Sequence, residues 1–233
     1  MIALLHTSPV HVPVFDALRD RDHPGVQLLH IVRVDLLDRA VKEGPDAVAP
    51  ALVEALTEAV GQGATSVLCT CSTLGAVAEA SAAAVGVPVV RVDRPMAAAA
   101  ARMPRVAVVA ALASTVEPTV ALIQEEARAL PVGRGGRDPD VRSVVVEGAW
   151  ERFLDGDREG YLDSVAAAVD ALCAPDADVD ADADADVDVV VLAQASMADA
   201  GGRVRTAVPV LSSPRSGLRG AVEAARAHRG SST

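Results

Sequence analysis

Aromatic residues and positive charge are both scarce in this sequence. It has one Trp, one Tyr and two Phe, although 51% of its 233 residues are hydrophobic. The core must therefore be built from Ala, Val and Leu in close packing. Asp and Glu outnumber Lys and Arg by 32 to 21, which gives a formal net charge of −11. Nucleic acid binding depends on clustered Lys and Arg, so we expect no nucleic acid partner.

The sequence also lacks a long uninterrupted apolar run. A membrane-spanning helix needs about 18 such residues, and the Ala-rich stretches here are broken by charges or glycine. The first residues, MIALLHTSPV, have neither the basic start nor the long apolar segment of a signal peptide. We therefore expect a cytoplasmic protein with no membrane partner.

Cysteine is rare and does not follow a zinc-binding pattern. The three cysteines are Cys69, Cys71 and Cys173, and no pair has CxxC spacing. An odd number of cysteines favours reduced thiols over a disulfide framework, and the spacing predicts no metal site. A thiol is therefore free to take part in chemistry.

Short runs rich in Val, Ile and Leu alternate with longer helical patterns along the whole chain. The apolar residues in these runs are continuous, which is typical of parallel strands buried on both faces. A repeated strand and helix order predicts a layered α/β fold. The expected strands lie in IALLH, VQLLHIVRV, SVLCTC, VPVVRV, RVAVVAA, VRSVVVEG, VDVVVLAQ and VPVLSS.

The two halves of the chain resemble each other. IALLHTSPV has a counterpart in VAVVAALAST, and VLCTCSTL matches VVLAQASM, which places Cys71 opposite Gln194. This similarity predicts two similar α/β lobes with mainly parallel sheets. We expect the first lobe to comprise residues 1–97 plus 208–233 and the second to comprise 98–207.

An acidic low-complexity segment, APDADVDADADADVD, occupies residues 174–188 of the second lobe. Its alternating Asp residues suggest a calcium loop, because carboxylate oxygens suit hard cations. An EF-hand loop counted from Asp176 would need Gly and Glu where the chain has Ala181 and Val187. We therefore expect a solvated loop between a helix and a strand.

Cys71 follows a predicted buried strand and precedes a predicted helix. Ser72 or Thr73 can cap that helix, whose unpaired N–H groups would then favour an anion. The same environment would lower the pKa of the Cys71 thiol toward neutrality. Alternatively, Cys71 is only a small buried hydrophobic residue. Cys69 lies deeper in the strand, where we expect it to belong to the core.

Hydroxyl residues also follow the first predicted strand of each half. Thr7 and Ser8 occupy this position in the first half, and Ser114 and Thr115 occupy it in the second. Ligands of open α/β sheets bind at the carboxyl ends of strands, so these residues are candidate donors to a carboxylate. Ordinary helix capping explains the same residue types.

The Cys71-Ser72-Thr73 sequence at a strand end, LAQASM at 192–197 and the opening IALLHTSPV resemble the aspartate/glutamate racemase superfamily. This superfamily includes hydantoin racemases, maleate isomerases and arylmalonate decarboxylases. The resemblance implies two lobes around a pseudo-twofold axis, with the active site in the cleft between them. It also implies a small-molecule carboxylate substrate, no cofactor and no metal, and it leaves a homodimer open.

In that family each lobe supplies one catalytic cysteine, and Cys71 matches the first. The second position holds Gln194, whereas Cys173 lies on the preceding predicted helix. An amide has no accessible pKa, so Gln194 can hydrogen bond but cannot exchange a proton as a thiol does. His6 is an alternative second acid or base, because its ordinary pKa is near 6.5. The resemblance implies carboxylate-binding roles for Ala195 and Ser196 together with Thr7, Ser8, Ser72, Thr73, Ser114 and Thr115.

Two further residues are weaker candidates. Asp93 follows the fourth strand, where it would close the cleft or pair with Arg94, and Arg215 follows the last strand, where its guanidinium would bind a second substrate carboxylate. The sequence thus predicts a cysteine-dependent isomerase or racemase that acts at the α-carbon of a small carboxylate or dicarboxylate. A one-thiol decarboxylase of a substituted malonate and a non-catalytic carboxylate-binding protein are the alternatives.

Overall fold

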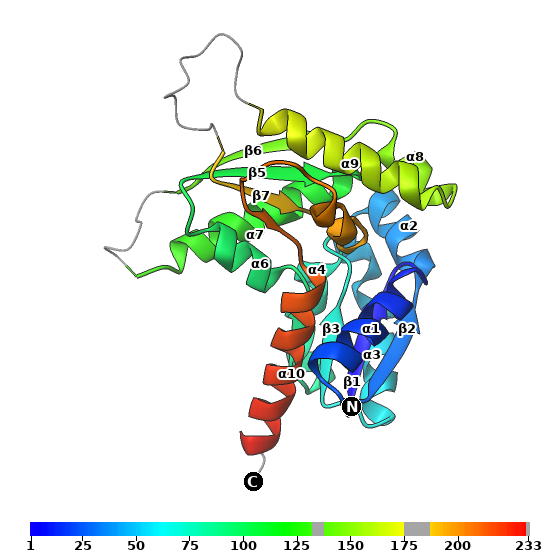
Figure 1. Cartoon of the computed structure of the whole chain (residues 1–233). Coiled ribbons are helices and arrows are strands. Elements are labelled where there is room, and N and C mark those ends of the chain that lie inside the picture. The colour runs from blue at the N-terminus through cyan, green and yellow to red at the C-terminus, as the bar shows by residue number, and fades with distance from the viewer. Residues whose placement is uncertain (132–137, 175–186, 232–233) are drawn as a thin grey trace. The chain divides into compact units, whose positions relative to one another are not determined.

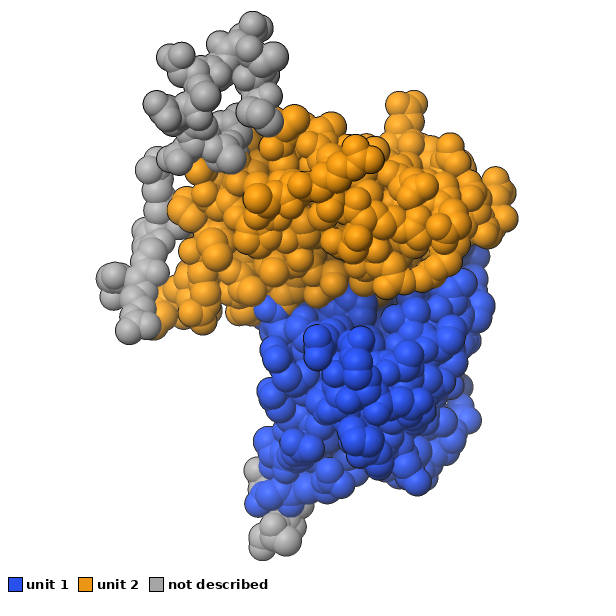
Figure 2. Space-filling view, in the orientation of Figure 1, with its two compact units in different colours: residues 1–95, 213–233 blue, residues 96–212 orange. Residues whose placement is uncertain are grey.

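A computed structural model describes residues 1–131, 138–174 and 187–231. The chain forms two compact units, residues 1–95 with 213–233 and residues 96–212 (Figure 2). Each unit contains a four-stranded sheet in which every pairing is parallel. The α/β fold class predicted from the apolar runs is therefore confirmed.

The first unit has the strand order β2-β1-β3-β4. Its strands are β1 (Ile2–His6), β2 (Leu28–Val32), β3 (Ser66–Cys69) and β4 (Val89–Arg91). Its helices are α1 (His11–Asp22), α2 (Val34–Glu43), η1 (Pro45–Val48), α3 (Ala49–Gly61), α4 (Gly75–Ala80), α5 (Ala82–Val85) and α10 (Pro214–Ser231). The helix α6 (Arg94–Ala100) begins at the boundary with the second unit.

Side chains of the first sheet alternate between two cores. Ala3, Leu5 and Cys69 pack into a cluster with residues of α2, α3 and α4, whereas Leu4 and Leu68 pack with α1 and α10. Both faces of the sheet are thus covered by helices, which explains why the strand sequences are continuously apolar. Figure 1 shows α10 lying along this sheet, next to β3.

The second unit repeats this arrangement with the order β6-β5-β7-β8. Its strands are β5 (Arg105–Ala110), β6 (Asp140–Val145), β7 (Val189–Leu192) and β8 (Val210–Leu211). The other elements are η2 (Ala113–Thr115), α7 (Val116–Arg128), α8 (Ala149–Leu154), α9 (Arg158–Leu172) and η3 (Ala195–Gly202). Residues of α9 and η3 pack in one core of this unit, and residues of α6 and α7 pack in the other.

The boundaries between the units differ from those expected at 97/98 and 207/208. The structure divides the chain after Pro95 and after Ser212. The second shift arises because β8 pairs with β7, Val190 opposite Val210, so residues 208–212 belong to the sheet of the second unit. The first arises because Met96 and Ala97 pack in a core of that unit.

Most of the acidic segment 174–188 lies outside the described residues, so the expected solvated loop stays a prediction. Its last residue, Asp188, is described; it directly precedes β7 and its side chain is half-buried. The Asp188 carboxylate accepts hydrogen bonds from the backbone N–H of Arg105 at 2.9 Å and from the Arg105 guanidinium at 2.8 Å. Among the described helices, none is long and apolar enough to cross a bilayer.

Candidate functional site

Cys71 begins the turn that connects β3 to α4. The strand ends at Cys69, which lies opposite Leu5 of β1. The backbone N–H of Leu74 donates to the carbonyl of Cys71 at 3.2 Å, and that of Gly75 donates to Ser72 at 3.2 Å. Two consecutive turns therefore separate Cys71 from the first residue of the helix.

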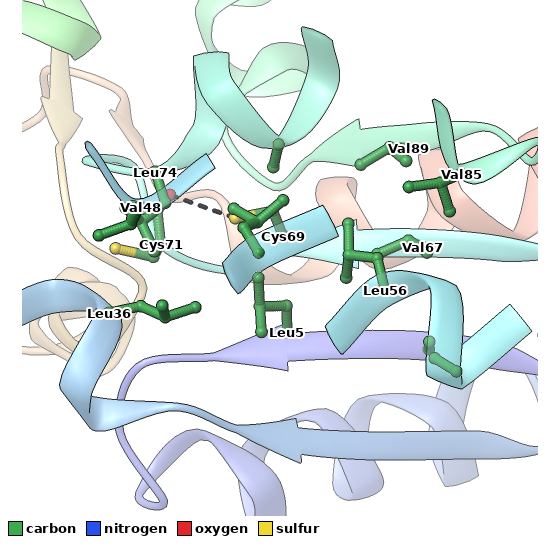
Figure 3. Packing of buried hydrophobic residues seen from close by; sticks show 14 of the residues in the cluster. Leu5, Leu36, Val48, Leu56, Val67, Cys69, Cys71, Leu74, Val85 and Val89 are labelled. Atoms are coloured by element: carbon green, nitrogen blue, oxygen red, sulfur yellow. Dashed lines mark hydrogen bonds between the residues drawn. The ribbon is translucent and has the colours of Figure 1, made fainter. Parts of the chain in front are cut away.

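The Cys71 thiol is buried and surrounded by hydrogen-bond donors. The residue is 8% exposed, and its sulfur accepts hydrogen bonds from the Thr7 hydroxyl and from the backbone N–H groups of Thr73 and Leu74. Figure 3 shows the side chain beside Leu36 and Leu74, in the core that covers one face of the first sheet.

Burial raises the pKa of the Cys71 thiol, contrary to the lowered value expected beside a helix N-terminus. The three donors oppose this effect, and the negative charge of Asp93 adds to it. The expected lowering is therefore wrong for the structure described, because loss of solvent outweighs the stabilisation of the thiolate by hydrogen bonds. At neutral pH the thiol keeps its proton.

Cys69 belongs to the core, as expected from its place in the strand. Its side chain is fully buried, and burial raises the pKa of its thiol. The Cys69 Sγ–H donates to the carbonyl of Cys71 at 3.5 Å, the contact drawn as a dashed line in Figure 3. Cys69 thus supports the turn without presenting a reactive sulfur.

Ser72 and Thr73 are both buried beside Cys71. They do not cap the helix as expected, because α4 begins only at Gly75, and its N-cap, Leu74, makes no side-chain cap hydrogen bond. The turn of residues 71–74 displaces the helix start by one to two residues. The contribution of Thr73 to the thiol comes from its backbone N–H.

Asp93 lies in a buried ion pair with Arg91. The Nε and Nη2 atoms of Arg91 donate to the two carboxylate oxygens of Asp93 at 2.8 and 2.9 Å. The Arg94 guanidinium donates to Glu79 of α4, a partner that was not expected. Because Asp93 acts electrostatically on the Cys71 thiol, it belongs to the surroundings of the candidate site.

Gly75 allows Arg91 to lie against the start of α4. A Cβ atom on Gly75 would stand 2.8 Å from Nε of Arg91 and 3.1 Å from its Cζ. Neither Arg91 nor Gly75 was singled out from the sequence. The available signal was the position of Asp93 directly after the apolar run VPVVRV, because a carboxylate buried there requires a cation nearby.

His6 is not arranged as an acid or base partner of Cys71. Its Nδ1 is 2.8 Å from Oγ1 of Thr70, and its Nε2 is 2.8 Å from Nδ1 of His30. Burial is the main cause that lowers the pKa of His6 to about 3. Successive strand residues point to opposite faces, so Leu5 and Thr7 lie on the Cys71 side and His6 lies toward α1.

Gln194 occupies the position in the second unit that Cys71 occupies in the first. Leu192 of β7 lies opposite Val109 of β5, as Cys69 lies opposite Leu5, and Gln194 and Cys71 each follow two residues later. The correspondence inferred from the sequence therefore agrees with the strand register.

The Gln194 amide is held in one orientation. Its Oε1 accepts hydrogen bonds from the backbone N–H groups of Ala111 at 2.6 Å and Leu112 at 3.4 Å. Its Nε2 is buried and has no hydrogen-bond partner among the described residues. The side chain thus offers a donor and no free acceptor.

Residues after Gln194 contact α9. The Tyr161 and Ser196 hydroxyls are hydrogen bonded at 2.8 Å, and burial raises the pKa of Tyr161 to about 12. Ala195 is buried at the start of η3. Cys173 follows the last residue of α9 and is half-buried. The contact of Tyr161 with Ser196 was not predicted from the sequence. Tyr161 is the single Tyr of the chain, but that alone does not indicate a function.

The remaining candidates have local partners or surface positions. The Thr115 hydroxyl donates to the Leu112 carbonyl at 2.7 Å, in the loop next to the Gln194 amide, and Ser114 precedes it. Ser8 is half-buried in the loop after Thr7. Arg215 is 71% exposed and donates to the Asp22 carboxylate at 2.9 Å, so it serves as a surface ion pair rather than joining the Cys71 cluster.

No three His, Cys, Asp or Glu residues in the described ranges are grouped so as to hold a metal ion.

The candidate residues form one group in each unit. In the first unit Thr7, Ser72 and Thr73 lie beside Cys71, and Asp93 acts on it through its charge. In the second unit the structure brings Gln194 to the loop that contains Ser114 and Thr115.

Comparison of the sequence found no matching family model and no matching curated protein. Comparison of the structure found similar solved proteins. Glutamate racemase from Francisella tularensis superposes with a TM-score of 0.69 at 10% identity, over 95% of this chain and 79% of that one. Glutamate racemase from Bacillus anthracis gives 0.66 at 16% identity, over 99% and 82%.

A variant of arylmalonate decarboxylase, solved in a sulfate-associated form, gives a TM-score of 0.60 at 23% identity, over 97% of this chain and 93% of that one. These matches span nearly the whole chain and both parallel sheets. At such identities they establish the fold. The chain has the same α/β fold, with two parallel sheets, as these glutamate racemases and arylmalonate decarboxylase.

Proposed function

We propose that this protein is a cofactor-independent enzyme that moves a proton at the α-carbon of a small carboxylate, with Cys71 as its acid and base. The observation that carries the proposal is the set of three donors around the Cys71 sulfur, from Thr7, Thr73 and Leu74. A structural cysteine needs no such donors, because a thiol is readily buried among apolar side chains. Donors stabilise the thiolate that remains after proton transfer.

The chemistry of Gln194 favours a reaction that needs one thiol. In the racemases that the chain resembles, the second lobe supplies a second thiol, and here the equivalent residue is an amide whose oxygen is already bonded to Ala111 and Leu112. An amide cannot accept a proton from carbon near neutral pH. Decarboxylation of a substituted malonate is therefore the reaction that these side chains support best.

The proposed reaction balances with Cys71 alone. The bond between the α-carbon and one carboxylate breaks, CO₂ leaves with neither a proton nor the bonding electrons, and the electron pair stays on the carbon and the remaining carboxylate. The Cys71 Sγ–H then donates its proton to that carbon. The resulting thiolate regains a proton from water. A thiol whose pKa is raised by burial is in the protonated form that this step requires.

The residues next to Cys71 are suited to hold the remaining carboxylate. Ser72 and Thr73 are buried polar residues in the same turn, and their hydroxyls are donors of the kind that bind carboxylate oxygens. Ser8, Ser114, Thr115, Ala195 and Ser196 remain candidates by position only. We assign Thr7 to the Cys71 sulfur and not to the substrate carboxylate, because its hydroxyl donates to Cys71.

The test is incubation of the protein in D₂O with substituted malonates, amino acids and hydantoins, followed by proton NMR. We expect release of CO₂ from a malonate and a product that carries one deuterium at the α-carbon. Cys71→Ser should abolish turnover, whereas Cys173→Ser, which changes a half-buried cysteine at the end of α9, should retain it.

Two results would redirect the proposal. Deuterium exchange with inversion of an amino acid would show racemisation and a second base that replaces the missing thiol. Saturable binding of malonates without any turnover, unchanged in Cys71→Ser, would identify a carboxylate-binding protein instead of an enzyme.

A further inference from the structure

Three of the five histidines in the chain lie together in the first unit, on the side of the sheet that faces α1. The rings of His6 on β1 and His30 on β2 stack at a centroid distance of 5.1 Å, and His11 of α1 lies 6.1 Å from His6. The proposed reaction uses none of them.

A continuous line of short contacts connects this cluster to the residue before Cys71. Nε2 of His30 is 3.4 Å from Oδ1 of Asp16, and Nδ1 of His30 is 2.8 Å from Nε2 of His6. Nδ1 of His6 is 2.8 Å from Oγ1 of Thr70, and Oγ1 of Thr70 is also 3.0 Å from the carbonyl oxygen of Leu5. We refer to Asp16, His30, His6 and Thr70 as the histidine chain.

The histidine chain can be fully hydrogen bonded in two ways. With both rings neutral, Thr70 donates its O–H to His6 Nδ1, His6 donates Nε2–H to His30, and His30 donates Nε2–H to Asp16. With one proton more, His30 carries two N–H groups and donates to both Asp16 and His6. His6 then holds its single proton on Nδ1 and donates to Thr70, whose O–H turns to Leu5.

We propose that the histidine chain is a proton-linked positioning device for the Cys71 turn, in which protonation of His30 reverses the direction of the hydrogen bonds as far as Thr70. The two states differ by one proton, which comes from solvent and resides on the His30 ring. His6 stays neutral in both and changes only its tautomer. Thr70, His6, His30 and Asp16 are positioning residues, because none of them donates to the Cys71 sulfur.

The burial of the four residues fits this arrangement. The Asp16 side chain is 40% exposed and that of His30 is 17% exposed, whereas His6 and Thr70 are buried. A proton from solvent therefore reaches the outer end of the chain first. Burial and the neighbouring histidines lower the pKa of His6 to about 3. His30 is the ring that lies against the Asp16 carboxylate, so the geometry places the additional proton on His30.

The inner end of the chain adjoins the Cys71 turn directly. Thr70 lies between Cys69 and Cys71, and its backbone N–H donates to the Leu5 carbonyl at 3.0 Å. In the protonated state its hydroxyl donates to the same carbonyl, so both hydrogen bonds of Thr70 are made to the Leu5 backbone. In the neutral state one hydrogen bond is made to that carbonyl and the other to the His6 ring.

Charged and titratable groups of α1 face the chain. Arg19 donates to the same oxygen of Asp16 that faces His30, at 3.1 Å. The buried His11 ring lies beside His6, and burial lowers the pKa of His11 to about 4, so His11 is neutral near neutral pH. The Arg33 guanidinium, next to β2, is paired with Asp35.

The experiment is a pH titration of the full-length protein labelled with ¹⁵N in its histidines, using long-range ¹H–¹⁵N correlation to assign tautomers. Over the titration we expect His6 to change from the Nε2–H to the Nδ1–H tautomer as His30 becomes doubly protonated. One unchanged His6 tautomer throughout this change would overturn the proposal.

Variants distinguish the pH-dependent change of the His6 tautomer, referred to as the switch, from a general loss of protein stability. In His30→Asn the His6 tautomer should no longer depend on pH, whereas His23→Asn, which removes a histidine outside the chain, should leave the switch intact. Asp16→Asn should move the transition to lower pH, because it removes the carboxylate that stabilises protonated His30. This variant serves as the test if His30→Asn fails to fold.

The link to Cys71 has its own readout, which does not require an active enzyme. The rate of Cys71 alkylation by iodoacetamide, measured by peptide mass spectrometry, should show a step at the pH of the tautomer change in the wild type and in His23→Asn. That step should be lost in His30→Asn. A wild-type profile with no such step would overturn the positioning role.

Discussion

The hydroxyl of Thr7, the first residue after β1, donates a hydrogen bond to the sulfur of Cys71, two residues after the end of β3. The two strands are neighbours in a parallel sheet, so the residues that follow them meet at one edge. This contact ties the reactivity of the thiol to a side chain far away in the sequence.

Replacing Thr7 by Val should make Cys71 less acidic and less reactive. A hydrogen bond to a charged group contributes about 1.5–3 kcal/mol, which corresponds to about one to two pKa units. We expect the alkylation rate of Cys71 near pH 7.5 to fall about tenfold or more, with the pH profile moved upward. Thr7→Ser, which keeps the hydroxyl, should react almost as the wild type does. Equal profiles for Thr7→Val and Thr7→Ser would show that the hydroxyl does not act on the thiol.

Removing the carboxylate of Asp93 should destabilise the first unit. Asp93→Asn removes the carboxylate that pairs with the buried Arg91 guanidinium, and breaking a buried ion pair from one side costs about 3–5 kcal/mol. Urea unfolding should report this loss in the free energy of unfolding. Asp35→Asn is the matched control, because Asp35 pairs with Arg33 at the surface and such pairs contribute about 0–1 kcal/mol. Similar losses for both variants would contradict the assigned importance of the buried pair.

Gly75→Ala tests the close approach of Arg91 to α4. The new Cβ would stand 2.8 Å from Nε of Arg91, and overpacking of this kind costs about 1–3 kcal/mol. Gly61→Ala, in α3, meets no atom within 4 Å and should be neutral or slightly stabilising, because Ala has the higher helix propensity. Thermal or urea unfolding compares the two. A Gly75→Ala protein as stable as the wild type would mean that Arg91 moves aside at no cost.

Installing a thiol at position 194 should add racemase chemistry. Gln194→Cys places a thiol at the position equivalent to Cys71, and a thiol can exchange a proton where an amide cannot. We expect exchange of the α-proton with inversion for the decarboxylation product, measured in D₂O by proton NMR and chiral chromatography. Gln194→Ser should show no such exchange. Absence of exchange in a folded Gln194→Cys variant would count against equivalent roles for positions 71 and 194.

Stability should fall as the pH falls from about 6.5 toward 4. The pKa of His6 is about 3 and that of His11 about 4 in the folded protein, against 6.5 as the ordinary value. Below 6.5 the unfolded chain binds protons on these residues that the folded chain does not, so protonation favours unfolding. From His6 alone the full loss is at most about 5 kcal/mol, reached only near its folded pKa.

Urea unfolding at about pH 7 and about pH 4.5 measures this dependence. His6→Gln removes one of the two titrating groups, so its free energy of unfolding should change less between these pH values than that of the wild type. If the difference in the free energy of unfolding between the two pH values were the same in His6→Gln as in the wild type, the pKa of His6 would not be lowered in the folded protein.

The sheet and the candidate turn could be predicted because their signals are local. Continuous apolar runs such as IALLH and RVAVVAA indicate strands buried on both sides, and β1 and β5 occupy them. The equivalence of position between Cys71 and Gln194 could be predicted from the repeated order of segments in the two halves. The strand registers of the two sheets agree with it. The boundary after Ser212 could not be predicted, because it depends on the pairing of β8 with β7.

The sequence by itself determined which residue types stand at the ends of the strands: a thiol and two hydroxyls after β3, and an amide after β7. Only the tertiary structure decided how they behave. It raised the pKa of Cys71 through burial, brought the Thr7 hydroxyl to its sulfur, and turned His6 away toward Thr70 and His30. Desolvation and hydrogen bonding depend on neighbours that are distant in the chain, and no local pattern of residues records them.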